Sequence, residues 1–459
     1  FWLKDFSKGI ANVMAPSVTG MALRSTMAAS LAAWLAAAAA TVPGRGQQPA
    51  GADAGGIDFD SLLKPIAADA ASRFGHAVQI GLATAQGSFS AAGGAIDSTG
   101  TSGNTEDLYA LGSITKTFTG AAIMRLAADG KLSLEDPAVR YIDPIFQKLG
   151  YPYNLDGLFS SDHWWLKPPV QYNATTITVR DLLSMKSGIR DYDTNAFRDL
   201  QFRHPEVDFT AVDLFDLAHG PLMFKPGQEM NYCSINFMLL GYVLLYHDGT
   251  VDWEAFDQAK FLPEPLRSKL VEGGLRFARR GPFGKYSRVH GFDETGKSVD
   301  VMNVSALGGW TAGNAFAPMS AAAEWGRAHW GCSSDLLPEK DCLAMRPGPF
   351  SFYGLATMSF SGVAGGEGAY KAAYGHLGDT FGFNSILAYF PKLDIAFAIA
   401  VNFETDTQDA PRDVLCSAYN RVKDALLDVT SRSCHYVPGS YYGGHCECNT
   451  TASTESFII

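Results

Sequence analysis

The 459-residue chain carries ALGSITKTFTGAAIMRLAADGKLSLEDP at residues 110–137, and this stretch constrains its architecture more than any other. Apolar side chains recur in it at helical spacing, namely at Phe118, Ala122 and Leu126. Gly130 follows and supplies a stop signal. We therefore expect an amphipathic helix over residues 113–129 that is buried on one side.

The start of this helix carries Ser113-Ile-Thr-Lys116, an S-x-x-K pattern. Residues three apart share a helix face, so the hydroxyl and the amine are expected side by side. A lysine can act as the base for a serine nucleophile when burial lowers its pKa. The pattern is short, and Ser113 alone is equally well an ordinary helix start. A second match, Ser61-Leu-Leu-Lys64, is expected on an outer amphipathic helix and interpreted as a chance match.

Two further patterns follow in the chain. The first, Asn-Tyr232-Cys-Ser234, places a phenol and a small polar side chain before the apolar run INFMLLGYVLL. The second, Tyr374-Gly-His376-Leu-Gly378, comes directly before a strand-like segment. In isolation, Tyr232 is more often a half-buried aromatic residue and His376 a structural hydrogen-bonding residue. Their order after Ser113 is what favours chemistry.

With these patterns the sequence resembles the serine β-lactamase and penicillin-binding superfamily, in its β-lactamase-related branch near class C enzymes, D-aminopeptidases and esterases. The resemblance covers roughly residues 57–430. Besides the opening stretch, it rests on TVRDLLSMKSGIRDY (178–192), FKPGQEMNYCSINFMLLGYVL (224–244), ALGGWTAG (306–313) and GHLGDTFGFNSILAYFPKLDIAFAIAVNFE (375–404).

The resemblance implies a role for each matching residue. Ser113 is expected to be the acyl-accepting nucleophile and Lys116 its proton partner, with Tyr232 sharing or relaying the proton. Backbone N–H groups of Ser113 and of Asp379, which follows Gly378, are expected to form the oxyanion hole. No metal or organic cofactor is implied.

The sequence departs from the family pattern at two positions. His376 stands where many β-lactamases carry the lysine of K-T-G, so recognition of a substrate carboxylate should weaken or become pH dependent. Ser234 stands where the family usually places the asparagine of Y-x-N, and a hydroxyl lacks the paired donor and acceptor of an amide. Asn236 could compensate only if the loop shifts. These departures resemble esterases or peptidases more than dedicated β-lactamases.

The order of elements predicts an α+β fold. A hairpin is expected over 76–96, helices over 178–186, 210–218 and 409–430, and strands over 353–360, 384–390 and 394–402. Strands at both ends with helices between them indicate a layered α+β plan, in which both ends complete one sheet and a helical lobe is inserted between residues 140 and 350. The family resemblance implies that this is the β-lactamase/transpeptidase-like fold, an antiparallel sheet flanked by helices. The expected divisions are a leader (1–40), a flexible linker (41–56), the catalytic domain (57–430) and a cysteine-containing tail (431–459).

The leader resembles a secretory signal peptide when it is read from Met21. Arg24 supplies the positive region, and the apolar run 27–40 is too short for a transmembrane helix, which needs about 20 residues. Cleavage near Ala40 is expected, and an organellar transit segment is the alternative. We therefore expect a secreted or lumenal protein.

Seven cysteines are compatible with disulfides in such a compartment. Cys332 and Cys342 could form one bridge, and four further cysteines gather near the end of the chain, at Cys416, Cys434, Cys446 and Cys448. The segment from His435 to His445, with its neighbouring cysteines, is only a weak zinc candidate. Sequons at Asn173, Asn303 and Asn449 agree with secretion.

Composition narrows the partners. Hydrophobic residues make up 47% of the chain, which excludes a disordered protein. A formal charge of −11 disfavours nucleic acid and anionic membranes. Together with the motifs, the family resemblance predicts a serine hydrolase that acts on a small-molecule or peptide ester or amide; the oligomeric state is left open. The alternative is a catalytically weak scaffold or binding protein with the same fold.

Overall fold

The architecture was examined in a computed structural model that describes residues 56–160, 172–293, 299–349, 351–439 and 444–449. From Asp58 onward the chain forms one compact unit. The predicted leader, with its signal peptide, lies outside the described residues, as does all of the predicted linker except Gly56. None of the helices in the described part of the chain has the length and apolar character that a membrane span requires.

A six-stranded antiparallel sheet forms the centre of the unit, in the order β2-β1-β11-β10-β9-β8. Its strands are β1 (Val78–Thr84), β2 (Gly87–Gly93), β8 (Met358–Ser359), β9 (Tyr374–Thr380), β10 (Phe383–Phe390) and β11 (Ile395–Val401). Val78 of β1 pairs with Val401 of β11, so segments more than 300 residues apart complete one sheet. The predicted sheet closed by both ends of the catalytic domain, and the predicted hairpin, are confirmed.

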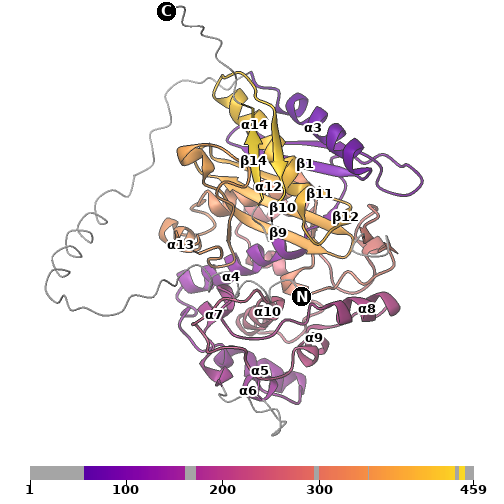
Figure 1. Cartoon of the computed structure of the whole chain (residues 1–459). Coiled ribbons are helices and arrows are strands. Elements are labelled where there is room, and N and C mark those ends of the chain that lie inside the picture. The colour runs from indigo at the N-terminus through magenta and orange to yellow at the C-terminus, as the bar shows by residue number, and fades with distance from the viewer. Residues whose placement is uncertain (1–55, 161–171, 294–298, 350, 440–443, 450–459) are drawn as a thin grey trace, which may run out of the picture. The chain divides into compact units, whose positions relative to one another are not determined.

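Helices cover both faces of this sheet (Figure 1). They are α3 (Phe59–Phe74) and α14 (Asp409–Leu426) on one face and α12 (Met319–Trp330) on the other. Two glycines mark how close the layers come. A Cβ on Gly93 would lie 2.6 Å from the Ala67 carbonyl oxygen of α3, and one on Gly81 would lie 2.0 Å from the Met319 carbonyl oxygen of α12. Because both faces are covered, every residue of β1, β10 and β11 is buried.

The helical lobe lies beside the sheet layers (Figure 1). It comprises α5 (Val139–Leu149), α6 (Leu155–Leu158), α7 (Val179–Leu183), α8 (Asn195–Arg203), α9 (Ala211–Leu217) and α10 (Ser234–Asp248). The next helix, α11 (Leu266–Glu272), packs against α12 instead. The predicted helices at 178–186 and 210–218 are confirmed as α7 and α9, and each begins with a capping box, from Thr178 and Thr210.

The region between residues 140 and 350 is not wholly part of this lobe. Its later part returns to the sheet layers through α12, and α13 (Glu339–Ala344) follows. Short strands form two small sheets: β3 (Tyr109–Ala110), β4 (Arg276–Phe277) and β7 (Ala315–Ala317), and β5 (Phe292–Asp293), β6 (Val299–Asp300) and β12 (Phe403–Glu404). Trp310, Trp325 and Trp330 are buried in the core.

Three sequence predictions need correction. The helix expected over 113–129 exists as the 3-10 turn Gly112–Ile114 followed by α4 (Thr115–Ala128). It is not amphipathic, because the sheet layers and the lobe bury it on nearly all faces. The pattern around His376 lies inside strand β9, not before a strand. In addition, only β8 is regular within 353–360.

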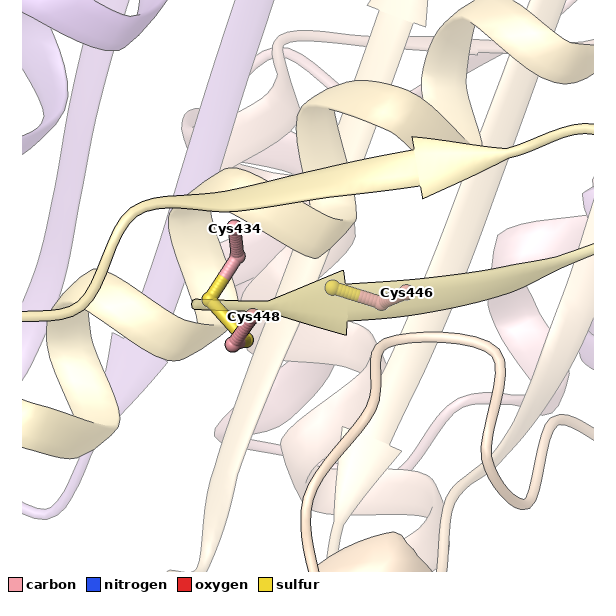
Figure 2. Close-up of side chains that lie close together, drawn as sticks. All are labelled: Cys434, Cys446 and Cys448. Carbon is pink, nitrogen blue, oxygen red and sulfur yellow. A yellow bond between two sulfur atoms is a disulfide. The ribbon is translucent and has the colours of Figure 1, made fainter. Parts of the chain in front are cut away.

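Three disulfides join six of the seven cysteines, Cys332–Cys342, Cys416–Cys446 and Cys434–Cys448, and Cys233 is free and buried. The last closes a hairpin in the tail, β13 (Cys434–Val437) with β14 (His445–Cys448), and Cys416 fastens that hairpin to α14. Figure 2 shows Cys434 bonded to Cys448, with Cys446 beside them. Disulfides of this kind persist in oxidising compartments.

Candidate active site

Ser113 lies in the 3-10 turn that leads into α4, and two glycines allow strand β9 to reach it. Gly112 has φ +51°, and a Cβ there would lie 2.7 Å from the backbone nitrogen of Asp379. A Cβ on Gly378 would lie 2.1 Å from the carbonyl oxygen of Leu111. Only glycine fits at such distances. The backbone N–H groups of Ser113 and Asp379 are therefore brought to the same corner of the molecule.

Lys116 lies one turn along, fully buried, with its amine toward Ser113. The Lys116 Nζ donates to Ser113 Oγ at 2.8 Å and to the carbonyl oxygen of Ala312 at 3.0 Å. Burial lowers the pKa of Lys116 from 10.5 to about 8. The neutral form of the amine, which can accept a proton, is thereby favoured near neutral pH. The predicted pairing of hydroxyl and amine is present, with the electrostatics that a general base requires.

Tyr232 precedes α10 and lies beside the same amine. The Lys116 Nζ is 5.0 Å from the centroid of the Tyr232 ring. The Tyr232 ring also lies 6.2 Å from the His376 ring and 6.0 Å from the Tyr353 ring, centroid to centroid. Ser113, Lys116, Tyr232 and His376, predicted from three separate segments, therefore meet in one place.

His376 is fully buried in β9. Its Nδ1 lies 2.6 Å from the Leu377 carbonyl oxygen, which can only accept, so Nδ1 carries the proton and Nε2 accepts from the Tyr353 hydroxyl at 3.0 Å. Burial, with a smaller contribution from Lys116, lowers the pKa of His376 to about 3. The imidazole is thus neutral at physiological pH. Replacing lysine by His376 was expected to weaken carboxylate recognition or to make it pH dependent. A neutral imidazole fits the first expectation, whereas a pKa of about 3 does not fit a change of charge near neutral pH.

Ser234 is the first residue of α10 and is buried, and its backbone N–H donates to Asp191 Oδ2 at 2.9 Å. Asn236 does not substitute for the missing amide. Its side chain is fully buried, where Oδ1 accepts from Ser187 Oγ at 2.6 Å and Nδ2 donates to Met185 Sδ at 3.5 Å.

A carboxyl pair, half-buried Asp379 and buried Glu404, supports the end of β9, and sequence reasoning missed it. The Asp379 side chain accepts from Asn384 Nδ2 at 3.0 Å and from Gln408 Nε2 at 2.8 Å. Burial and the nearby Glu404 raise the pKa of Asp379 well above its usual range. Glu404 is in turn paired with Arg198 of α8. The network ties the helical lobe to the strand end that carries the Asp379 N–H group.

Asp191 is a second residue that sequence reasoning did not single out, although it lies within the stretch 178–192. Burial and the neighbouring Asp193 raise the pKa of Asp191 to about 7. In sequence it is one of 47 acidic residues, and its only distinguishing signal is the Ser-Gly-Ile-Arg that precedes it.

Three cysteines of the tail lie close enough together to be considered as metal ligands. Among the described residues, the one group of three potential ligands whose atoms lie within 4.8 Å of one another is Cys434, Cys446 and Cys448. Cys434 is bonded to Cys448 (Figure 2), and Cys446 is bonded to Cys416. The expectation that these cysteines can form disulfides is therefore confirmed.

Comparisons with known proteins agree with the geometry. Residues 84–415, more than half of the chain, match the Beta-lactamase family model. Protein flp of Staphylococcus aureus (strain COL) is 30% identical over 138 residues, which cover 30% of this chain and 22% of that protein. The match therefore spans less than a quarter of the length of this relative.

Solved structures share the fold at low identity. A D-stereospecific amidohydrolase from Streptomyces sp. gives a TM-score of 0.56 at 21% identity, covering 76% of this chain and 96% of that one. The D-amino acid amidase from Ochrobactrum anthropi SV3 gives 0.60 at 18%, covering 80% and 100%. The octameric penicillin-binding protein homologue from Pyrococcus abyssi gives 0.57 at 18%, covering 82% and 78%. With the family model matched over most of the catalytic domain and the β-lactamase/transpeptidase-like fold in place, the chain belongs to the beta-lactamase family.

Proposed function

We propose that the protein is a serine hydrolase that opens an ester or amide through an acyl-enzyme on Ser113. The observation that carries the proposal is the 2.8 Å contact between Ser113 Oγ and the buried Lys116 Nζ. Because burial lowers the pKa of Lys116 to about 8, the amine is available as a base near neutral pH.

In the acylation step, neutral Lys116 accepts the proton of Ser113 Oγ while that oxygen attacks the substrate carbonyl carbon. The negative charge that develops on the carbonyl oxygen is stabilised by the backbone N–H groups of Ser113 and Asp379. The carbon-to-leaving-group bond then breaks, and the proton held by Lys116 passes to the leaving group. Tyr232, whose ring lies beside the amine, is the candidate relay for that transfer.

Deacylation reverses these roles. Water attacks the acyl carbon, loses a proton to Lys116 and displaces Ser113 Oγ, which takes a proton back. The same oxyanion donors serve both half-reactions, since each passes through a tetrahedral intermediate. All proton transfers are therefore assigned to Lys116 and Tyr232, and the reaction as proposed uses only groups of this chain.

Three features favour uncharged ester substrates over β-lactams. His376 is neutral where a lysine would attract a carboxylate. Ser234 offers no amide, and the Asn236 side chain is turned to Ser187.

The relatives named amidohydrolase and D-amino acid amidase keep amides among the substrates to be tested. The three disulfides support a secreted or lumenal location for this activity.

The test is covalent labelling of the purified protein with a fluorophosphonate probe, read by intact-mass and peptide mass spectrometry. We expect a single adduct on Ser113 and hydrolysis of p-nitrophenyl acetate. Ser113→Ala should lose both, and Ser61→Ala, at the second S-x-x-K, is the matched control that should retain both. A folded wild-type protein that takes no label and hydrolyses no ester would instead support the scaffold alternative. A panel of β-lactams and D-amino acid amides then defines the substrate class.

A further inference from the structure

The loop between α7 and α8 carries a half-buried carboxylate, Asp191, that the proposed reaction does not use. Its Oδ2 accepts a hydrogen bond from the backbone N–H of Ser234 at 2.9 Å. Ser234 opens α10 and lies two residues after Tyr232. The carboxylate therefore fastens the segment that presents the Tyr232 ring to Lys116.

The same carboxylate acts electrostatically on Lys116. Among the groups that perturb the pKa of Lys116, burial is the largest, and the negative charge of Asp191 is the strongest that opposes it. Asp193, on the same loop, and the Cys233 thiol, before α10, oppose burial more weakly. From β9, His376 faces the amine as a neutral group.

Asp191 exerts this effect without capturing the amine. Within the described chain Lys116 makes no salt bridge, and its Nζ hydrogen bonds go to Ser113 Oγ and the Ala312 carbonyl oxygen. A direct ion pair would hold the amine as ammonium and turn it away from the nucleophile. A carboxylate that acts on Lys116 electrostatically, without a direct ion pair, raises the affinity of the amine for a proton and leaves its contact with Ser113 intact.

The two groups titrate close together. The pKa of Lys116 is lowered to about 8 and that of Asp191 is raised to about 7, in each case mainly by burial. Such a pair gains and loses protons as a unit. Near neutral pH the charge on Asp191 thus bears directly on whether Lys116 is free to accept a proton.

We propose that Asp191 is a positioning residue for this hydrolase, which sets the proton affinity of Lys116 by its charge and holds the Tyr232 segment by its hydrogen bond to Ser234. The inference rests on the proposed function, because it concerns the base of that reaction. It assigns Asp191 no contact with substrate.

Asp191→Asn separates the two roles, since the amide oxygen still accepts from the Ser234 N–H while the charge is lost. Lys116 must be neutral to take the Ser113 proton, so the labelling rate rises as pH rises through the pKa of Lys116. Asp191 is itself mostly protonated at pH 6, because its pKa is raised to about 7, so the two limbs should coincide there. Above pH 7 the wild-type carboxylate is charged and stabilises the ammonium, so we expect the midpoint of the Asp191→Asn limb to lie about 0.5 pH unit below that of wild type.

The measurement is the rate of fluorophosphonate labelling between pH 5 and 10. Asp191→Glu keeps the charge and should keep the wild-type limb. Asp193→Asn removes a charge from the same loop and should shift the limb by less. Asp191→Ala loses charge and acceptor and should combine the shift with a lower plateau. If Asp191→Asn does not fold, as judged by circular dichroism, Asp191→Ser provides a second neutral acceptor.

The outcomes separate the two proposals. A wild-type protein that does not label defeats the proposed function and the inference with it. A wild type that labels, with an Asp191→Asn limb superimposable on its own, overturns the inference alone. A lower plateau without a shift would reduce Asp191 to a structural residue and also overturns it.

Discussion

Ser113–Lys116 and Ser61–Lys64 are the two S-x-x-K pairs of the chain, and they lie in opposite environments. Ser61 is exposed in the first turn of α3, where its hydroxyl donates to the carboxylate of Asp58 at 2.5 Å, and Lys64 is exposed beside it. Ser113 faces a fully buried amine between the sheet layers and the helical lobe. The S-x-x-K pattern fixes only the spacing of the hydroxyl and the amine, whereas burial lowers the pKa of the amine.

Exchanging the serines is the strongest test of this comparison. Ser113→Ala removes the attacking oxygen, so we expect kcat/KM for p-nitrophenyl acetate to fall on the order of 10⁴-fold or more. Ser61→Ala removes a hydroxyl that bonds only to the neighbouring Asp58, so the rate should stay at the wild-type value. Comparable losses in both variants would mean that the two pairs are not different in kind.

Exchanging the lysines tests the contribution of burial. Lys116→Met deletes the base, and we expect a loss of about 10²- to 10⁴-fold in kcat/KM. The same change should leave the melting temperature unchanged or raise it, because a buried charge is replaced by an apolar side chain of similar length. Lys64→Met is the matched control and should alter neither quantity. A lower melting temperature for Lys116→Met would show that the lysine stabilises the fold.

How far the sequence predicts the molecule depends on whether the determining contacts are local. Ser113, Lys116 and Tyr232 were identifiable because short patterns carry them. Asp379 was predicted only through its backbone, since Gln408 and Glu404, which act on its carboxyl, lie beyond strands β10 and β11 in the chain. Strand β9 was missed because two glycines and a histidine interrupt its apolar alternation.

Other predictions failed because burial is a tertiary property. The helix over 113–129 was expected to be amphipathic, with one exposed face. Its own sequence does not indicate that the helical lobe also covers that face. The tail hairpin has few apolar residues, so its sequence lacks the apolar alternation by which a strand is recognised. A cross-strand disulfide, Cys434–Cys448, joins its two strands. The sequence suggested the bridge Cys332–Cys342, which is confirmed, whereas the pairing of the four later cysteines could not be derived from their spacing.

Close approach of β9 to the nucleophile is a further difference between the two pairs, and Gly378→Ala tests it. The new Cβ would meet the Leu111 carbonyl oxygen and Ser385 Oγ, both at 2.1 Å, so the strand must move away from the turn that holds Ser113. A displacement of about 1 Å is expected to lower kcat/KM about 100-fold. Gly348→Ala, where a Cβ meets nothing within 4 Å, should have no effect. Full activity in Gly378→Ala would show that the oxyanion donor is supplied elsewhere.

His329 tests whether burial in this core depresses the pKa of a base that has no role in the reaction. It is fully buried on α12, stacked on Trp325, and within the described chain neither ring nitrogen has a hydrogen-bond partner. Burial lowers its pKa from 6.5 to about 3. In this pH range His329 is protonated in the unfolded state but stays neutral in the folded state. The free energy of unfolding therefore decreases as pH falls from 6.5 toward 3. At pH 5.5 the loss in the free energy of unfolding is about 1.4 kcal/mol.

We expect His329→Phe to make the free energy of unfolding fall less steeply between pH 6.5 and 4.5. The change in slope should correspond to about one proton fewer taken up on unfolding, measured by urea titration at a series of pH values. His290→Gln, at a partly exposed histidine, is the control and should leave the slope closer to that of wild type. If His329→Phe and wild type lose stability in parallel, burial alone does not depress a base here, and the account of Lys116 would need a specific partner instead.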